Sequence, residues 1–208
     1  NAIWNPLSYM YINSGLRFAK YNRYDNLLTS PRLGVKLKIT SDLAFKLNWG
    51  TYYQYLYTTN EEDELLRIVD FWQPIPYGKI PQQADHYIIG SEYWIAEGNT
   101  ISVEAYYKNY KTIYELNPLR ESTKLESTLG IPGKAISYGI EFLYRLNFRK
   151  ISGWIGYSYM FTERTVDRNS DGTIWIEKEK YPAKYDKPHS FTTVLNYKIN
   201  KNYSMGFS

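Results

Sequence analysis

The stretch LAFKLNWGTYYQY, residues 43–55, decides the fold, because its side chains alternate strictly along the chain. One set of alternate positions is mostly apolar or aromatic: Leu43, Phe45, Leu47, Trp49, Thr51, Tyr53 and Tyr55. The other set is mostly polar or small: Ala44, Lys46, Asn48, Gly50, Tyr52 and Gln54. Successive side chains of a β-strand point to opposite faces, so the stretch predicts a strand with one apolar face and one hydrated face.

The same period of two recurs along the chain. It is clear in residues 32–39, 136–147, 154–162 and 189–199, weaker in 9–21, 85–96 and 100–113, and a ninth strand begins at Tyr203. A helix would place Lys36 and Lys38 beside an apolar stripe, which disfavours the helical interpretation. The pattern therefore predicts an all-β chain of about nine strands.

Strand length and loop length then separate two architectures. The strands run about 10–14 residues, whereas soluble strands average about 5–6 and a tilted strand needs ~9–11 to cross a bilayer. Tight turns (40–42, 97–99, 148–150 and 200–202) alternate with long connections (22–29, 56–83, 114–134 and 163–187). This alternation is typical of outer-membrane barrels. We expect a transmembrane antiparallel up-and-down β-barrel, with a soluble or surface β-sandwich that binds a ligand as the alternative.

Composition excludes several classes of protein. The 208 residues include no cysteine, which excludes a disulfide scaffold and a thiolate metal site. No run of apolar residues approaches the ~18 that a membrane-spanning helix needs. The net charge is only +4, and the sequence has no long run of basic residues that would suggest nucleic-acid binding. The 23 tyrosines suit a boundary between lipid and water.

The strand number suggests a partial barrel. Bacterial single-chain barrels have even strand numbers, whereas nine strands are predicted, and the sequence stops within a strand. We expect residues 1–208 to form part of one barrel domain, closed by strands outside these residues.

Five stretches resemble the barrel of TonB-dependent receptors, in a Bacteroidota-like form. They are SPRLGVKLKITSDLAFKLNWGTYYQYL (30–56), PQQADHYIIGSEYW (81–94), ISVEAYYKNYKTIYE (101–115), SYGIEFLYR (137–145) and YPAKYDKPHSF (181–191). Their order and spacing over nearly the whole chain carry the resemblance, since each piece alone is weak. The resemblance places the chain in the C-terminal half of such a barrel.

The resemblance implies a function that composition does not. Such receptors have a barrel of about 22 strands filled by an N-terminal plug. They lie in the outer membrane of Gram-negative bacteria and import scarce ligands such as iron chelates, cobalamin or glycans, with energy delivered through TonB. The plug and the TonB-contacting segment fall outside these residues. The resemblance implies partners in membrane lipid, plug, TonB and ligand, but no enzymatic activity, cofactor or nucleic acid.

Two groups of residues are candidates for function. The hydrated faces carry charges that would line the lumen, namely Lys36, Lys46, Glu92, Glu104, Lys108, Glu141 and Arg145. They could contact a plug or guide a polar ligand, or simply pair across strands as hydrated wall residues. Aromatic residues of the long loops could stack on a sugar or chelate ring, or only pack the loops: Trp72, Tyr77, Tyr114 and Trp175. Residues 60–72 also predict a short loop helix.

Metal and catalytic signals are weaker. Asp167, Asn169 and Asp171 match the first half of a calcium loop, but Lys178 stands where its final Glu should be, so a turn is the favoured interpretation. The two histidines, His86 and His189, show no spacing for catalysis with Ser91 or Ser190. We expect His189, with Tyr185 and Asp186, to anchor the last long loop instead.

Overall fold

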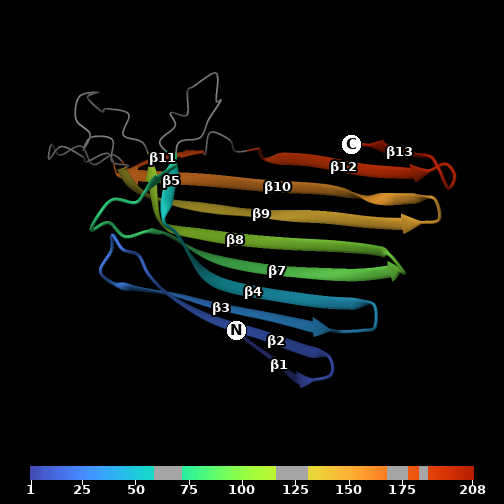
Figure 1. Ribbon diagram of the computed structural model, residues 1–208, viewed down its shortest axis with the longest axis horizontal. Coiled ribbons are helices and arrows are strands. Elements are labelled where there is room, and N and C mark those ends of the chain that lie inside the picture. Colours follow the sequence, from blue (N-terminus) through green and yellow to red (C-terminus); the bar gives the residue numbers. More distant parts are fainter. Residues whose placement is uncertain (59–71, 116–130, 168–177, 183–186) are drawn as a thin grey trace.

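The computed structural model describes residues 1–58, 72–115, 131–167, 178–182 and 187–208 (Figure 1). All regular secondary structure in these ranges is β-strand. No helix in the described part of the chain has the length and apolar character needed to cross a membrane.

Eleven strands form one antiparallel sheet, and two more form a small hairpin. The path of the large sheet follows the sequence, and it runs through β1 (Ala2–Leu7), β2 (Met10–Lys20), β3 (Leu27–Lys38), β4 (Leu43–Gln54), β7 (Gln82–Ala96), β8 (Asn99–Glu115), β9 (Ile131–Phe148), β10 (Ile151–Asp167), β12 (His189–Lys198) and β13 (Ser204–Phe207). The strand β11 (Lys178–Pro182) pairs with the far end of β10. The small hairpin joins β5 (Leu56–Thr58) to β6 (Trp72–Pro74).

In the described residues, the shortest connections between neighbouring strands lie at one end of the sheet, here called the turn end, as the sequence predicts. There β7 joins β8 through Glu97 and Gly98, and β9 joins β10 through Arg149 and Lys150. The other connections leave from the opposite end, here called the loop end (Figure 1). Strands β7 to β10 have 15 to 18 residues each, which exceeds the ~9–11 needed to cross a bilayer.

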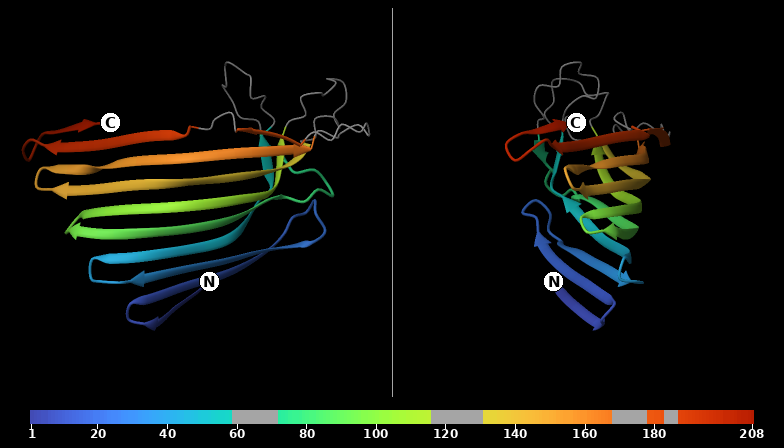
Figure 2. Two further views of the ribbon diagram at one scale, coloured as in Figure 1. Left: turned by 180° about the vertical axis from the view of Figure 1, so that it is seen from behind. Right: turned by 90° about the vertical axis from the view of Figure 1, so that its right-hand side faces the viewer.

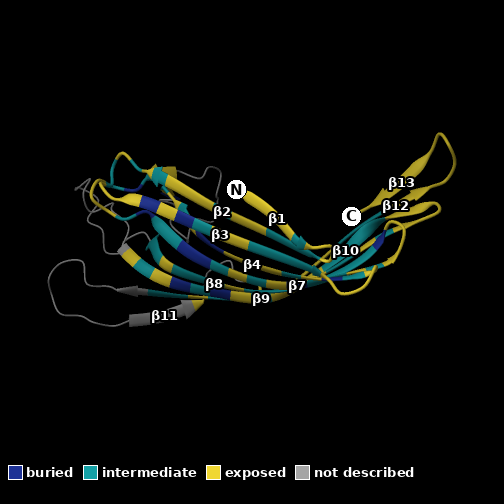
Figure 3. Cartoon of the chain, turned by 90° about the horizontal axis from the view of Figure 1, so that it is seen from below, coloured by how far each residue is buried: buried dark blue, intermediate teal, exposed yellow. Residues whose placement is uncertain are grey.

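The apolar face of the sheet is exposed, as expected for a lipid-facing wall. Phe45, Leu47, Ile140 and Phe142 all belong to the exposed large apolar residues, and none is packed inside a compact core. Exposed and less exposed residues alternate along the strands (Figure 3). A β-sandwich would cover this face with a second sheet, and the described strands provide no such sheet. The architecture is therefore that of a barrel wall.

The opposite, polar face carries small residues where strands crowd. The sheet is twisted and curved (Figure 2), and buried positions on this face include Ala44, Ala84 and Ala135. At Gly139 an added Cβ would lie 2.6 Å from the Tyr159 carbonyl oxygen and 2.9 Å from the Tyr106 hydroxyl oxygen. Glycine is required there by close approach of the neighbouring strand.

The strand count differs from the prediction of about nine. The large sheet gains β1 and β11, and its path runs from β1 to β13 without closing. Period two could not reveal β1, because Pro6 and a register shift between Trp4 and Leu7 interrupt it. The sequence of β11, KEKYP, is short and highly charged, so it carries no apolar face to detect. The fold is an open, all-antiparallel sheet, consistent with part of a barrel.

Candidate functional site

Lysines and a glutamate form an ion-paired cluster on the polar face near the turn end. Lys36 lies opposite Lys46 in the ladder between β3 and β4. Two cations directly opposite each other repel unless a counter-charge is present. Glu92 on β7 supplies it, with its Oε2 atom 2.8 Å from the Lys46 Nζ and 3.4 Å from the Lys36 Nζ. The three predicted lumen residues therefore act as one unit.

Further cations on this face lie over aromatic rings. The Lys36 Nζ is 4.9 Å from the centre of the Trp94 ring, and the Arg32 guanidinium is 4.7 Å from that of Tyr52. The Lys38 Nζ is 5.3 Å from the Tyr11 ring centre. Such contacts stabilise a cation without neutralising its charge. This part of the wall therefore presents positive charge to whatever lies beside it.

The remaining predicted lumen residues lie further along the same face. Glu104 on β8 lies directly opposite Glu141 on β9, and Arg145 lies opposite Thr100. Lys108 has its Nζ 4.5 Å from the centre of the Tyr106 ring. The sequence thus places all seven charges on one face, but only Lys36, Lys46 and Glu92 are brought together as an ion-paired cluster.

A second group of residues packs at the loop end, from the β2–β3 connection and the β5–β6 hairpin. The Tyr21 hydroxyl donates a hydrogen bond to the Ile75 carbonyl oxygen (2.8 Å), and its ring lies 5.1 Å from that of Tyr55. Burial raises the pKa of Tyr21, partly offset by the nearby Arg23 cation. The Gly78 N–H donates to the Arg23 carbonyl oxygen. Two connections far apart in sequence are thus joined.

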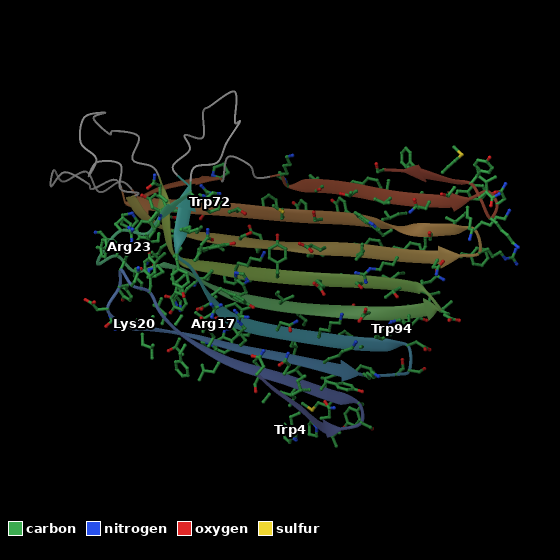
Figure 4. The ribbon with its side chains drawn as sticks, viewed as in Figure 1. Trp4, Arg17, Lys20, Arg23, Trp72 and Trp94 are labelled. Carbon is green, nitrogen blue, oxygen red and sulfur yellow. The ribbon has the colours of Figure 1, made fainter. Side chains whose placement is uncertain are left out.

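The predicted aromatic ligand contacts lie at or near this group. Trp72 begins β6, and 53% of its surface is exposed. Tyr77 is 72% exposed, and the Arg23 guanidinium lies over its ring, 4.8 Å from the ring centre. Figure 4 shows Arg23 and Trp72 at the loop end, and Trp94 toward the turn end. Tyr114 instead donates its hydroxyl hydrogen to the Ile80 carbonyl oxygen and packs on Tyr57. Trp175 and residues 60–71 of the predicted helix lie outside the described residues, and Trp72, the last residue of that prediction, lies in β6.

The two histidines are far apart. His86 on β7 stacks on Tyr52, whereas His189 on β12 has its Nδ1 atom 2.8 Å from the Tyr157 hydroxyl oxygen. Three strands separate β7 from β12, or about 19 Å at the usual strand spacing. They cannot share one catalytic centre. The predicted partners Tyr185 and Asp186 lie outside the described residues.

Metal-binding residues do not gather in the described ranges. No group of three or more His, Cys, Asp or Glu side chains suited to a metal ion is found there. Asn169 and Asp171 of the weak calcium motif fall outside these ranges, and Asp167 ends β10. The calcium hypothesis stays a prediction.

Two features of the structure are not predicted by the sequence pattern. Arg23 and Tyr21 lie in a short polar connection with no periodic signal, and their importance appears only when the β5–β6 hairpin packs against them. At the turn end, a polar cavity of about 290 Å³ is lined by basic and amide side chains that include Lys150, Lys198 and Lys201. The lysine-rich turns could have suggested it.

Comparison with known proteins supplies the family. The model of the family described as TonB dependent receptor-like, beta-barrel matches residues 4–207. Neither the curated proteins nor the solved structures give a match to the chain. The family match covers nearly the whole chain, and the open sheet with its exposed apolar face has the form that such a barrel requires. The chain belongs to the TonB-dependent receptor-like β-barrel family, whose members are outer-membrane receptors and transporters.

Proposed function

We propose that the chain forms part of the barrel wall of an importer in the outer membrane of a Gram-negative bacterium. The imported ligand is a scarce solute of the class of iron chelates, cobalamin or glycans. The observation that carries the proposal is the family match over residues 4–207 on a sheet whose apolar face is exposed. The protein acts as a transporter and not as an enzyme.

The dimensions of the apolar face support membrane insertion. On β9, Tyr138 and Phe148 both point to this face and are exposed. The ten residue steps from Tyr138 to Phe148 each rise ~3.3 Å along the strand. If the strand is tilted by about 40° from the barrel axis, they cover a height of about 25 Å along that axis. This equals the usual height of the apolar band of an outer-membrane barrel. Lipid is therefore the first partner of this surface.

Two further partners follow from the polar face and the loop end. The positive charge around Lys36 and Lys46 would contact an N-terminal plug within the lumen, which would in turn engage TonB. Trp72 and Tyr77 would offer ring faces to the ligand from the loop end, beside the Arg23 cation. Glu104, Glu141 and Arg145 would line the path between them.

Uptake by the intact receptor in its host tests the proposal. A strain lacking the gene is compared with a complemented strain in media limited for iron, for cobalamin or for one glycan source. The expected result is a growth defect in one medium, reproduced when TonB is deleted. Recovery of the protein in the soluble fraction, or uptake that does not depend on TonB, would rule the importer out.

A further inference from the structure

Five aromatic side chains form one continuous row across the apolar face. In the ladder, Trp49 lies opposite Tyr87, Tyr87 opposite Tyr107, Tyr107 opposite Tyr138, and Tyr138 opposite Phe161. The rings of Tyr87 and Tyr107 are 6.3 Å apart, and those of Tyr138 and Phe161 are 5.8 Å apart. Amphipathic rings in such a row favour the boundary between hydrocarbon and head groups.

The residues of the same face that lie one step beyond the aromatic row, toward the loop end, are polar. Asp85 lies two residues beyond Tyr87 and is 7% exposed. The Thr51 hydroxyl donates a hydrogen bond to its Oδ1 atom (2.7 Å), and the Lys111 Nζ lies 2.6 Å from its Oδ2 atom. A buried carboxylate on a lipid-facing surface is costly inside hydrocarbon, so this level lies beyond the apolar band.

A β-bulge brings a second lysine next to Lys111. The register between β8 and β9 shifts between Tyr110, opposite Ala135, and Ile113, opposite Gly133. Two residues of β8, Lys111 and Thr112, therefore face Lys134 alone, so β8 carries one extra residue at this point. Lys134 is exposed, and the Lys111 side chain keeps 48% of its surface exposed despite its ion pair. Two ammonium groups and one carboxylate give Asp85, Lys111 and Lys134 together a net positive charge, and Glu163 lies on the same face, opposite Ile136.

We propose that Lys111 and Lys134 bind the phosphate of an anionic lipid head group in the leaflet at the loop end. This inference rests on the proposed function, because it needs the sheet to lie in a membrane. Asp85 holds Lys111 at the head-group level, and the phosphate oxygens accept hydrogen bonds from both ammonium groups. A lipid fits better than free phosphate, because its acyl chains continue along the apolar face below Tyr107 and Tyr138.

Lipid retention by the purified receptor tests the inference. The intact receptor is exchanged into mixed micelles of phosphatidylglycerol and phosphatidylcholine, and native mass spectrometry counts the lipids that remain bound. In the double variant Lys111→Gln and Lys134→Gln, we expect retained phosphatidylglycerol to fall at least threefold with phosphatidylcholine unchanged. The matched control, Lys150→Gln and Lys201→Gln at the turn end, should retain phosphatidylglycerol at the wild-type level.

A charge-conserving variant guards against misfolding. Lys111→Arg with Lys134→Arg should keep phosphatidylglycerol bound, and heat-modified gel mobility confirms folding of every variant. Equal retention by the Gln double variant and wild type would overturn the inference, as would equal displacement by inorganic phosphate, which would indicate a free-phosphate site. A protein that retains neither lipid in any variant would contradict the membrane location itself. Loss of import with lysine-dependent retention intact would contradict only the transport function.

Discussion

The carboxylate of Glu92 lies within salt-bridge distance of both Lys46 (2.8 Å) and Lys36 (3.4 Å), two lysines that face each other across a β-ladder. One anion thus offsets a repulsion between two cations. The same polar face adds Lys38 near the turn end and Arg32 further along β3, each over an aromatic ring. Removing the Glu92 carboxylate should therefore lower stability, whereas modifying Lys36 and Lys46 should report on what lies beside the polar face.

Replacing Glu92 with Gln should destabilise the sheet. The two lysines would face each other without a counter-charge, and the Glu92 side chain, which is only 14% exposed, would lose its ionic partners. We expect the free energy of unfolding in lipid vesicles to fall by about 1–2 kcal/mol. Urea titration followed by tryptophan fluorescence measures it. Glu97→Gln, in the exposed β7–β8 turn, is the control and should change stability by less than about 0.5 kcal/mol.

Lys36 and Lys46 should form covalent cross-links to an acidic segment inside the lumen. A zero-length carbodiimide joins an ammonium group only to a carboxylate in contact with it. In the intact receptor, peptide mass spectrometry should find Lys36 or Lys46 joined to Asp or Glu residues outside residues 1–208. Lys20, which points to the apolar face of β2, is the control. Links from Lys36 and Lys46 to Glu92 alone would argue against contact with a plug.

Arginine on the apolar face should impair insertion. Leu47→Arg or Phe142→Arg places a cation near the middle of the apolar band, at a cost of about 2–4 kcal/mol. Glu141→Arg places the same side chain on the opposite face, next to Phe142 in sequence, and should insert nearly normally. Folding yield into vesicles, read from heat-modified gel mobility, distinguishes the two. Similar yields for Phe142→Arg and Glu141→Arg would mean that the faces are assigned wrongly.

Substitutions at two residues with positive φ in the tight turns should change stability in opposite directions. Gly98 has φ of 76°, and an added Cβ would lie 2.9 Å from the Asn147 Cβ, so Gly98→Ala should destabilise by about 1–2 kcal/mol. Arg149 has φ of 52° without being glycine, so Arg149→Gly should be neutral or stabilise by up to about 1 kcal/mol. Urea midpoints in vesicles measure both. A lower midpoint for Arg149→Gly would show that its side chain contributes more than the backbone strain costs.

Loop-end packing should respond to a single hydroxyl. Tyr21→Phe removes the hydrogen bond to the Ile75 carbonyl oxygen and leaves that acceptor without the Tyr21 donor. We expect a local loss of about 1 kcal/mol, seen as faster amide hydrogen exchange in the β5–β6 hairpin and not in β9. Tyr77→Phe, whose ring is mostly exposed, is the control and should leave exchange unchanged.

The sequence predicts those parts of the fold that depend on period two. Alternation alone predicts the strands around Leu47 and Phe142, because a sheet with one apolar face and one hydrated face requires it. Alternation also placed Lys36, Lys46 and Glu92 on one face. It could not reveal that these three meet, because the register between β4 and β7 sets that contact.

The period-two alternation does not predict features that depend on loops or bulges. Asp85 was within a predicted strand, but its ion pair with Lys111 needs the bulge after Tyr110, which shifts the phase of the alternation. Tyr114 was a candidate ligand contact, yet its hydroxyl already bonds the Ile80 carbonyl oxygen, a partner 34 residues away. Contacts of this kind arise from chain packing and leave no local periodicity.

The aromatic row from Trp49 to Phe161 has a consequence for how deeply the protein sits in its bilayer. Because neighbouring strands each contribute a ring to the boundary region, each ring resists vertical displacement together with the others. Immersion depth is therefore specified redundantly. Losing one ring should scarcely move the wall, whereas losing several together should let it sink or rise until another set of side chains meets the head groups.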